Sequence, residues 1–136
     1  QADLNDKDLE NIFKDLKFSA LIDRACLSCL SFDQIKNFFC KVKPFLSKKC
    51  KIYFTPYSID DSSCFPKEIG FKKPKSNSYF GDISEIMYYD KELIYSLAEA
   101  LSFKVIDFIQ YTSEKIVSSS SDEIEKISFY EVIMET

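Results

Sequence analysis

Glycine scarcity is the feature that most limits the folds open to this chain. Only two of its 136 residues are glycine, and after Gly81 the chain contains neither glycine nor proline. Two-residue β-hairpin turns favour glycine or asparagine because their central residues take positive φ. The scarcity therefore predicts a mainly α-helical single domain over residues 1–136, with at most one short pair of strands and an irregular loop at 56–78.

The last third of the chain carries the longest helical pattern. Apolar side chains keep one face from residue 91 to residue 117, which predicts a long amphipathic helix. Two segments, residues 18–30 and 103–134, also fit strands by alternation, so they stay open between helix and strand. The residues on the helical face are Ile94, Leu97, Ala98, Leu101, Val105, Phe108, Ile109 and Ile116.

A second helix has a clear start and a clear stop. Ser31 and Gln34 have the spacing of a capping box, which places the first turn of a helix directly after Ser31. Pro44 lacks a backbone donor and should end or kink that helix. Residues 50–55 then alternate as the best strand candidate of the chain.

The chain has no histidine. This absence excludes the Ser-His-Asp and Cys-His nucleophilic arrangements, zinc sites of the H-E-x-x-H type and any histidine general base. No P-loop, G-x-G-x-x-G or G-x-S-x-G motif occurs, and the acidic residues lack EF-hand spacing. The sequence therefore predicts a protein that is not an enzyme, with no catalytic residue, no metal site and no cofactor.

Five cysteines raise the question of redox chemistry. Their odd number would leave one outside a disulfide framework, so we expect buried free thiols and an intracellular location, with the nucleus as one option. The sharpest local pattern is Cys26-x-x-Cys29. It fits a redox pair or half of a zinc site, but core packing is the interpretation we favour.

The charges are unevenly distributed. Residues 1–78 carry a net charge of +4 and residues 79–136 carry −8. A basic run interleaved with aromatic residues could contact the phosphates of a nucleic acid, or it could be a solvated face. The run consists of Lys41, Lys43, Lys48, Lys49 and Lys51.

Aromatic residues suggest a second kind of surface. The chain has thirteen phenylalanines and eight tyrosines, and tyrosine is enriched in protein interfaces because it offers a large contact area at low entropic cost. Tyr88, Tyr89 and Tyr95 are the candidate partner-binding residues, although ordinary half-buried tyrosines would give the same pattern. No apolar run reaches the roughly 18 residues that a membrane span needs.

Residues 80–135 resemble a histone fold of the kind found in TFIID subunits. A short helix at 83–89 would precede a long central helix containing residues 105–109, and a short third helix containing 129–133 would follow. The resemblance implies an obligate heterodimer with another histone fold.

Residues 17–135 also resemble a checkpoint sliding-clamp subunit of the nine-one-one family. In that case residues 17–22 and 50–55 are the first two strands, and residues 32–47 form the helix between them. This resemblance implies an α+β fold that belongs to a DNA-associated assembly.

Taken together, these patterns favour a non-catalytic interaction module that presents an amphipathic or aromatic surface to a protein partner. The alternative is a subunit of a DNA-associated nuclear assembly, either histone-fold-like or clamp-like.

Overall fold

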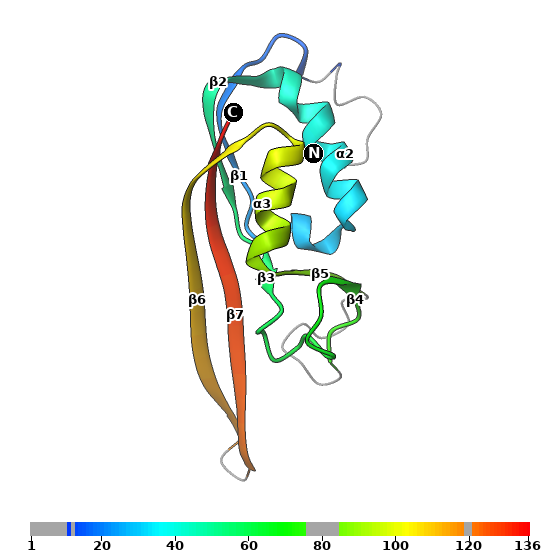
Figure 1. Ribbon diagram of the computed structural model, residues 1–136, viewed down its shortest axis with the longest axis vertical. Helices are drawn as coiled ribbons and strands as arrows, with labels where there is room; N and C mark the ends of the chain where they lie inside the picture. Colours follow the sequence, from blue (N-terminus) through cyan, green and yellow to red (C-terminus); the bar gives the residue numbers. More distant parts are fainter. Residues whose placement is uncertain (1–10, 12, 76–84, 119–120) are drawn as a thin grey trace.

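The protein is built on a β-sheet, as its computed structural model shows (Figure 1). The structure describes residues 11, 13–75, 85–118 and 121–136, although the side chains of residues 115–118 and 121–124 lie outside the description. Within this part of the chain, seven strands form one mixed sheet. The prediction of a mainly helical fold is therefore wrong. Scarce glycine limits tight turns, but it does not limit the length or the number of strands.

The described chain begins with a β-α-β unit and continues through three short strands, a second helix and two long strands. The elements are β1 (Phe18–Ile22), the 3₁₀ turn η1 (Leu27–Cys29), α2 (Phe32–Val42), the 3₁₀ turn η2 (Lys43–Phe45), β2 (Leu46–Phe54), β3 (Tyr57–Ser58), β4 (Gly70–Lys72), β5 (Ile86–Tyr89), α3 (Lys91–Ala100), β6 (Lys104–Ser118) and β7 (Ser121–Glu135).

The sheet combines two parallel pairs, β1 with β2 and β3 with β5, with antiparallel pairs between its other neighbouring strands. β1 and β2 run parallel, and α2 makes the crossover that such a pair requires. β7 pairs antiparallel with β2 on one side and with β6 on the other. β3 also pairs with β7, and it continues the sheet through β5 to β4. The two longest strands, β6 and β7, extend well beyond the helices in Figure 1.

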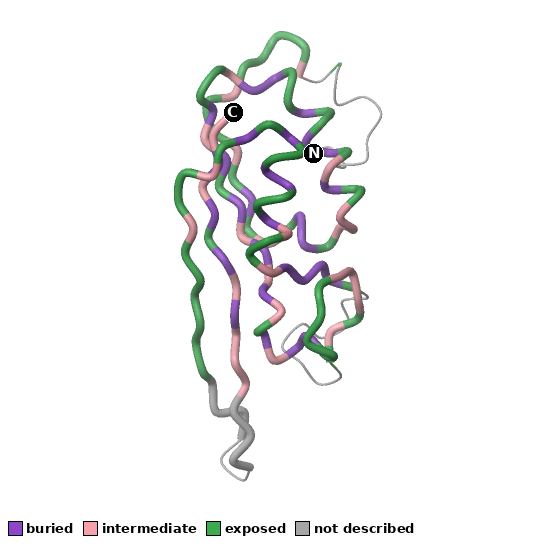
Figure 2. The backbone as a smooth tube through the Cα atoms, viewed as in Figure 1, coloured by how far each residue is buried: buried purple, intermediate pink, exposed green. Residues whose placement is uncertain are grey.

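One face of the sheet is covered and the other is open. Cys50, Ile52 and Phe54 alternate along β2 and are fully buried, whereas Tyr53 between them is 41% exposed. β7 alternates in the same way, and Figure 2 shows the change of colour along both strands. Because both helices contribute side chains to the same core as these buried positions, the helices cover one face and leave the other accessible.

The start and stop predicted for α2 are confirmed. Ser31 Oγ accepts a hydrogen bond from the backbone of Gln34, and the Gln34 side chain accepts one from the backbone of Ser31. The helix ends at Val42, and Pro44 lies in the 3₁₀ turn that follows. Its buried face meets the sheet at Phe39, whose ring packs edge-on against other aromatic rings of the core.

The long helix predicted for residues 91–117 is wrong, because α3 ends at Ala100. Ser102 takes a left-handed φ of 55°. Its N–H donates to the Glu99 carbonyl at 2.9 Å, and the Phe103 N–H donates to the Ala98 carbonyl at 2.8 Å. These two bonds form a Schellman closure, in which glycine usually occupies the left-handed position. Because serine occupies this position, the sequence lacks the glycine that usually signals the end of a helix.

A bulge explains why the residues after α3 still looked helical. The pairing of β6 with β7 shifts register between Val105 and Asp107. Val105 and Phe108 therefore both pack against the core although they lie three residues apart. Ile109 and Tyr111 are each 42% exposed on the same strand. Core-facing side chains three residues apart therefore occur both in a helix and in a strand whose bulge adds one residue.

Replacing Ser102 by glycine should stabilise the protein by about 0.5–1 kcal/mol, because glycine takes the left-handed conformation without steric cost. The matched control is Ser96→Gly, an exposed position inside α3, which should lower the free energy of unfolding by about 0.5 kcal/mol. Urea unfolding measures both values. If both variants changed the free energy of unfolding in the same direction, this explanation of the helix end would be contradicted.

The segment after β3 is held by a buried carboxylate. Asp61 is 0% exposed. Its Oδ1 accepts hydrogen bonds from the N–H and the hydroxyl of Ser63, and its Oδ2 accepts one from the Ser128 N–H at 2.8 Å. The Ser63 hydroxyl is also 2.7 Å from the Tyr88 hydroxyl. Asp61 therefore ties the segment after β3 to the middle of β7. This segment is part of the connection that was predicted to be an irregular loop.

No helix among the described residues is both long enough and apolar enough to cross a membrane.

Candidate functional site

A cleft lies where the parallel strands β1 and β2 end, on the open face of the sheet. Its volume is about 420 Å³. Ligands of open α/β sheets bind outside the carboxyl ends of parallel strands, so this is the edge at which a site is expected. The lining residues are Ile22, Asp23, Arg24, Tyr53, Phe54, Thr55, Glu131, Val132 and Ile133.

A second cleft of about 370 Å³ adjoins the first. Arg24, Thr55 and Glu131 line both, so the two clefts form one depression along the sheet. The second cleft adds apolar and aromatic walls from β7 and from the segment after β2. Its further lining residues are Ala25, Tyr57, Ile127 and Phe129.

The turn after β1 is clamped to the end of β2 by backbone and hydroxyl contacts. The Asp23 N–H donates to the Tyr53 carbonyl at 2.8 Å. The Thr55 hydroxyl donates to the Asp23 carbonyl at 2.9 Å and accepts from the Ala25 N–H at 2.8 Å. Ala25 takes a φ of 62°, which is strained for a residue with a side chain. Such strain persists where the surrounding contacts hold it, and it occurs often at functional sites.

Asp23 is the unusual residue of this edge, because it is a carboxylic acid that is only 5% exposed. Its Oδ1 accepts a hydrogen bond from the Leu27 N–H at 2.9 Å. Its Oδ2 is buried and has no partner among the described residues. Burial raises the pKa of Asp23, and the backbone hydrogen bonds that it accepts offset part of this effect. A buried oxygen without a partner is costly, so it marks a position where a bound group would be stabilised.

The hydroxyl of Tyr89 shares this environment. Tyr89 is fully buried, and its hydroxyl has no hydrogen-bond partner among the described residues. Burial raises the pKa of Tyr89, and the charge of Asp23 raises it further. The phenol therefore stays protonated and remains a hydrogen-bond donor within the core.

The tyrosines predicted to bind a partner do not share a surface. Tyr88 and Tyr89 are both 0% exposed, so their side chains are not part of the protein surface. Tyr95 is 44% exposed, and its ring lies 5.8 Å from that of Phe108. The cause lies in β5, where all four residues are buried between neighbouring strands and the core.

The predicted basic run extends from the last turn of α2 through the η2 turn into β2. Four of its lysines have exposed side chains, and one is partly buried. The Lys43 ammonium donates to the Leu101 carbonyl at 2.5 Å and lies over the Phe103 ring. Nucleic-acid contact through this run stays a prediction. Its members are Lys41, Lys43, Lys48, Lys49 and Lys51.

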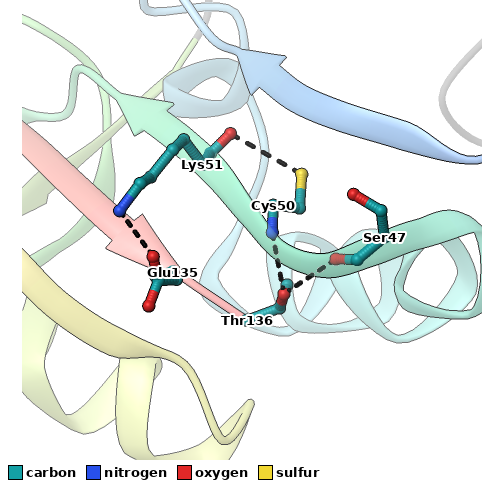
Figure 3. Close-up of polar contacts among 5 residues, drawn as sticks. All are labelled: Ser47, Cys50, Lys51, Glu135 and Thr136. Carbon is teal, nitrogen blue, oxygen red and sulfur yellow. Dashed lines mark hydrogen bonds and ion pairs between the residues drawn. The ribbon is translucent and has the colours of Figure 1, made fainter.

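The end of β7 occupies part of this basic region (Figure 3). The Lys51 ammonium pairs with Glu135 Oε2 at 2.5 Å, and this contact lowers the pKa of Glu135. The Thr136 hydroxyl accepts from the Cys50 N–H and donates to the Ser47 carbonyl, so the last residues of β7 are tied to β2. Lys51 is therefore engaged within the sheet.

The expectation of buried thiols fails for three of the five cysteines. Cys50 and Cys64 are buried, whereas Cys26, Cys29 and Cys40 are exposed. Core packing is therefore not the role of the C-x-x-C pair. Among the described residues, no three acidic or cysteine side chains are grouped so that they could hold a metal ion.

Sequence reasoning did not select the residues of the cleft. Asp23 and Arg24 directly follow the alternating segment that becomes β1, and Thr55 directly follows β2. The sequence feature that could have pointed to the cleft is the presence of polar residues directly after two successive strands. The signal becomes specific only when the two strands are known to be parallel neighbours, which brings their carboxyl ends to one edge.

Comparison with known proteins bears on the fold alone. No protein-family model matches the sequence, and no curated protein matches it. Solved structures with a similar fold include one described as a SAM-dependent methyltransferase. The matched structure is a SAM-dependent methyltransferase from Methanosarcina mazei, with a TM-score of 0.57 and 10% sequence identity. The match covers 90% of this chain and 62% of the other chain.

This similarity corrects several expectations. The histone-fold and sliding-clamp resemblances are contradicted, because the matched fold is a mixed sheet of the methyltransferase type. The predictions of a helical, non-enzymatic interaction module and of a DNA-associated subunit are contradicted as well: the described residues form a mixed sheet, and the solved structure that shares this fold is that of a SAM-dependent methyltransferase. A chain without histidine or glycine-rich motifs cannot use histidine-based catalysis or those motifs. It could still catalyse a reaction by binding and orienting the reacting groups.

Proposed function

We propose that this chain takes part in methyl transfer from S-adenosylmethionine, and that the cleft at the ends of β1 and β2 is the site. The observation that carries the proposal is the buried Oδ2 of Asp23, which has no partner among the described residues. It lies at the strand edge where ligands of this class of fold bind. The methyltransferase fold of the matched structure supports the reaction type.

The residues of the cleft fit the chemical groups of S-adenosylmethionine. The carboxylate of Asp23 can accept hydrogen bonds from an amino or hydroxyl group and can balance a positive charge. Arg24 can pair with a carboxylate, and the ring of Tyr53 offers an aromatic face to a cation. A volume of about 420 Å³ is within the range of small-molecule sites. When bound, S-adenosylmethionine supplies a methyl group carried on a sulfonium cation.

In this proposal, the protein's own residues bind S-adenosylmethionine and orient it. Thr55 holds the backbone of Asp23 and Ala25, and so it sets the position of the carboxylate. The apolar side chains along β7 limit the access of water to the reacting groups, which strengthens electrostatic interactions there. No proton transfer by a histidine is required, which agrees with a chain that has none.

The test is equilibrium binding of S-adenosylmethionine to the purified protein by calorimetry. Asp23→Asn should weaken binding at least tenfold, because a hydrogen bond to a charged group contributes about 1.5–3 kcal/mol. Glu99→Gln removes the same charge from an exposed position of α3 and should leave the affinity within about twofold. Absence of saturable binding to the unmodified protein, or equal affinities for all three proteins, would contradict the proposal.

Unfolding measurements separate this effect from a loss of stability. The pKa of Asp23 is raised, so its ionisation costs more in the folded protein than in the unfolded chain. The resulting penalty is absent at low pH and develops as the pH rises above 3.8, the ordinary value for aspartate. Asp23→Asn keeps the acceptor for the Leu27 N–H, so it should unfold at neutral pH with an equal or higher free energy.

The protein or nucleic-acid partner and the intracellular location expected from the sequence stay predictions alongside this proposal.

A further inference from the structure

The two cysteines of the C-x-x-C motif stand at either end of a single 3₁₀ turn. The Cys29 N–H donates to the Cys26 carbonyl at 3.1 Å, which closes the turn. Side chains three residues apart in a 3₁₀ helix lie one above the other. The α-carbons that bracket such a turn are less than about 7 Å apart, and disulfides span about 4.4–6.8 Å between α-carbons. Both thiols are exposed, so a reagent in solution can reach them.

The electrostatics of the turn agree with this geometry. Burial raises the pKa of Cys29, and the neighbouring Cys26 and Asp23 raise it further. Cys26 is therefore close enough to Cys29 to influence the ionisation of the Cys29 thiol. In contrast, Cys40 lies on α2, outside this turn.

The turn is anchored to the candidate site by Leu27, the first of the two residues between the cysteines. Leu27 is 2% exposed, and its N–H donates to Asp23 Oδ1 at 2.9 Å. The Leu30 N–H in turn donates to the Leu27 carbonyl at 3.0 Å. A covalent link across the turn would therefore restrict the backbone that carries one of the hydrogen bonds to Asp23.

We propose that Cys26 and Cys29 form a reversible disulfide across this turn, and that the disulfide rigidifies the hydrogen bond from Leu27 to Asp23. The pair is assigned to redox chemistry and not to zinc, because the described residues offer no group of three ligands. The assignment does not depend on methyl transfer. It adds a covalent modification site next to the cleft.

The reaction is a thiol–disulfide exchange with a small-molecule disulfide as the oxidant. The Cys26 thiolate attacks one sulfur of the reagent, and one small thiolate leaves and takes up a proton. The Cys29 sulfur, after losing its proton, then displaces the second small thiolate from the mixed disulfide. The two protein thiols are oxidised to one disulfide, and the reagent is reduced to two small thiols. A dithiol reductant reverses both steps.

The experiment treats the full chain with oxidised glutathione and then alkylates the remaining thiols. Mass spectrometry of the peptide that contains both cysteines should show the loss of two hydrogen atoms and no alkylation, and dithiothreitol should restore two alkylated thiols. Cys40→Ser should behave like the unmodified protein. Cys26→Ser and Cys29→Ser should each abolish the internal disulfide. Because both positions are exposed, the two variants should stay folded, and circular dichroism checks this.

Hydrogen exchange measures the consequence for the turn. In the oxidised protein, the Leu27 amide should exchange at least about tenfold more slowly than in the reduced protein, because the link removes open conformations of the turn. The Cys26→Ser protein should show no such change after the same treatment. Glutathione retained separately on the two cysteines, or an unchanged exchange rate at Leu27 after disulfide formation, would overturn the proposal. Neither readout uses S-adenosylmethionine, so failure here is distinct from failure of the proposed function.

Discussion

Replacing Phe39 by alanine should lower the free energy of unfolding by about 4 kcal/mol, because it removes a fully buried ring and leaves a cavity. Phe39 is 0% exposed, and its ring meets those of Phe38, Phe54 and Phe103 edge-on at centroid distances of 5.4, 6.5 and 5.7 Å. These rings belong to α2, β2 and the segment after α3, so one cavity weakens the contact between the helices and the sheet. Urea unfolding at neutral pH measures the change.

Phe65→Ala is the matched control for the core substitution. Phe65 is 73% exposed, so the same truncation should change the free energy of unfolding by no more than about 0.5 kcal/mol. In thermal unfolding, we expect a melting temperature lower by roughly 12 °C for Phe39→Ala. A loss below about 2 kcal/mol for Phe39→Ala would mean that the helices and the sheet do not pack around this residue.

The second large effect is expected at Asp61. Asp61→Ala should lower the free energy of unfolding by about 3 kcal/mol, because several buried donors lose their acceptor at once. These donors are the N–H and hydroxyl of Ser63 and the N–H of Ser128. The loss also separates the segment after β3 from β7, so amide exchange at Ser128 should accelerate together with the drop in stability.

Two comparison variants test the role of the carboxylate at this position. Asp61→Asn keeps one acceptor oxygen but turns an amide donor toward a backbone or hydroxyl donor, so it should remain destabilising by about 2 kcal/mol. Asp60→Ala removes the neighbouring carboxylate, which is exposed and contacts Gln110, and should cost about 0.5 kcal/mol or less. Equal effects at the two aspartates would show that burial of Asp61 is not what makes it important.

The sequence predicted an element correctly where its start and end depend only on interactions between neighbouring residues. The capping box of Ser31 and Gln34 and the stop at Pro44 depend on bonds within a few residues, and the structure confirms both. The end of α3 is also local. It was missed because Ser102 occupies a left-handed position in which glycine is the usual signal.

Periodicity failed where a strand imitates a helix. Val105 and Phe108 match helical spacing, yet the bulge in β6 brings both toward the core of a sheet. The pairing partner that decides this is Met134 and its neighbours in β7, about thirty positions away in the sequence. No pattern within β6 alone contains that information.

The sequence by itself determined that this chain has no histidine to use in catalysis and that α2 begins and ends where it does. Tertiary structure alone decided that β1 and β2 are parallel neighbours and that β7 lies against β2. That arrangement brings Asp23 and Thr55 to one edge. The pairing of β5 with β3 and β4 likewise places Tyr88 and Tyr89 inside the sheet, where they are buried. The physical reason is that capping and turn formation depend on adjacent residues, whereas strand pairing and burial depend on residues brought together from distant parts of the chain.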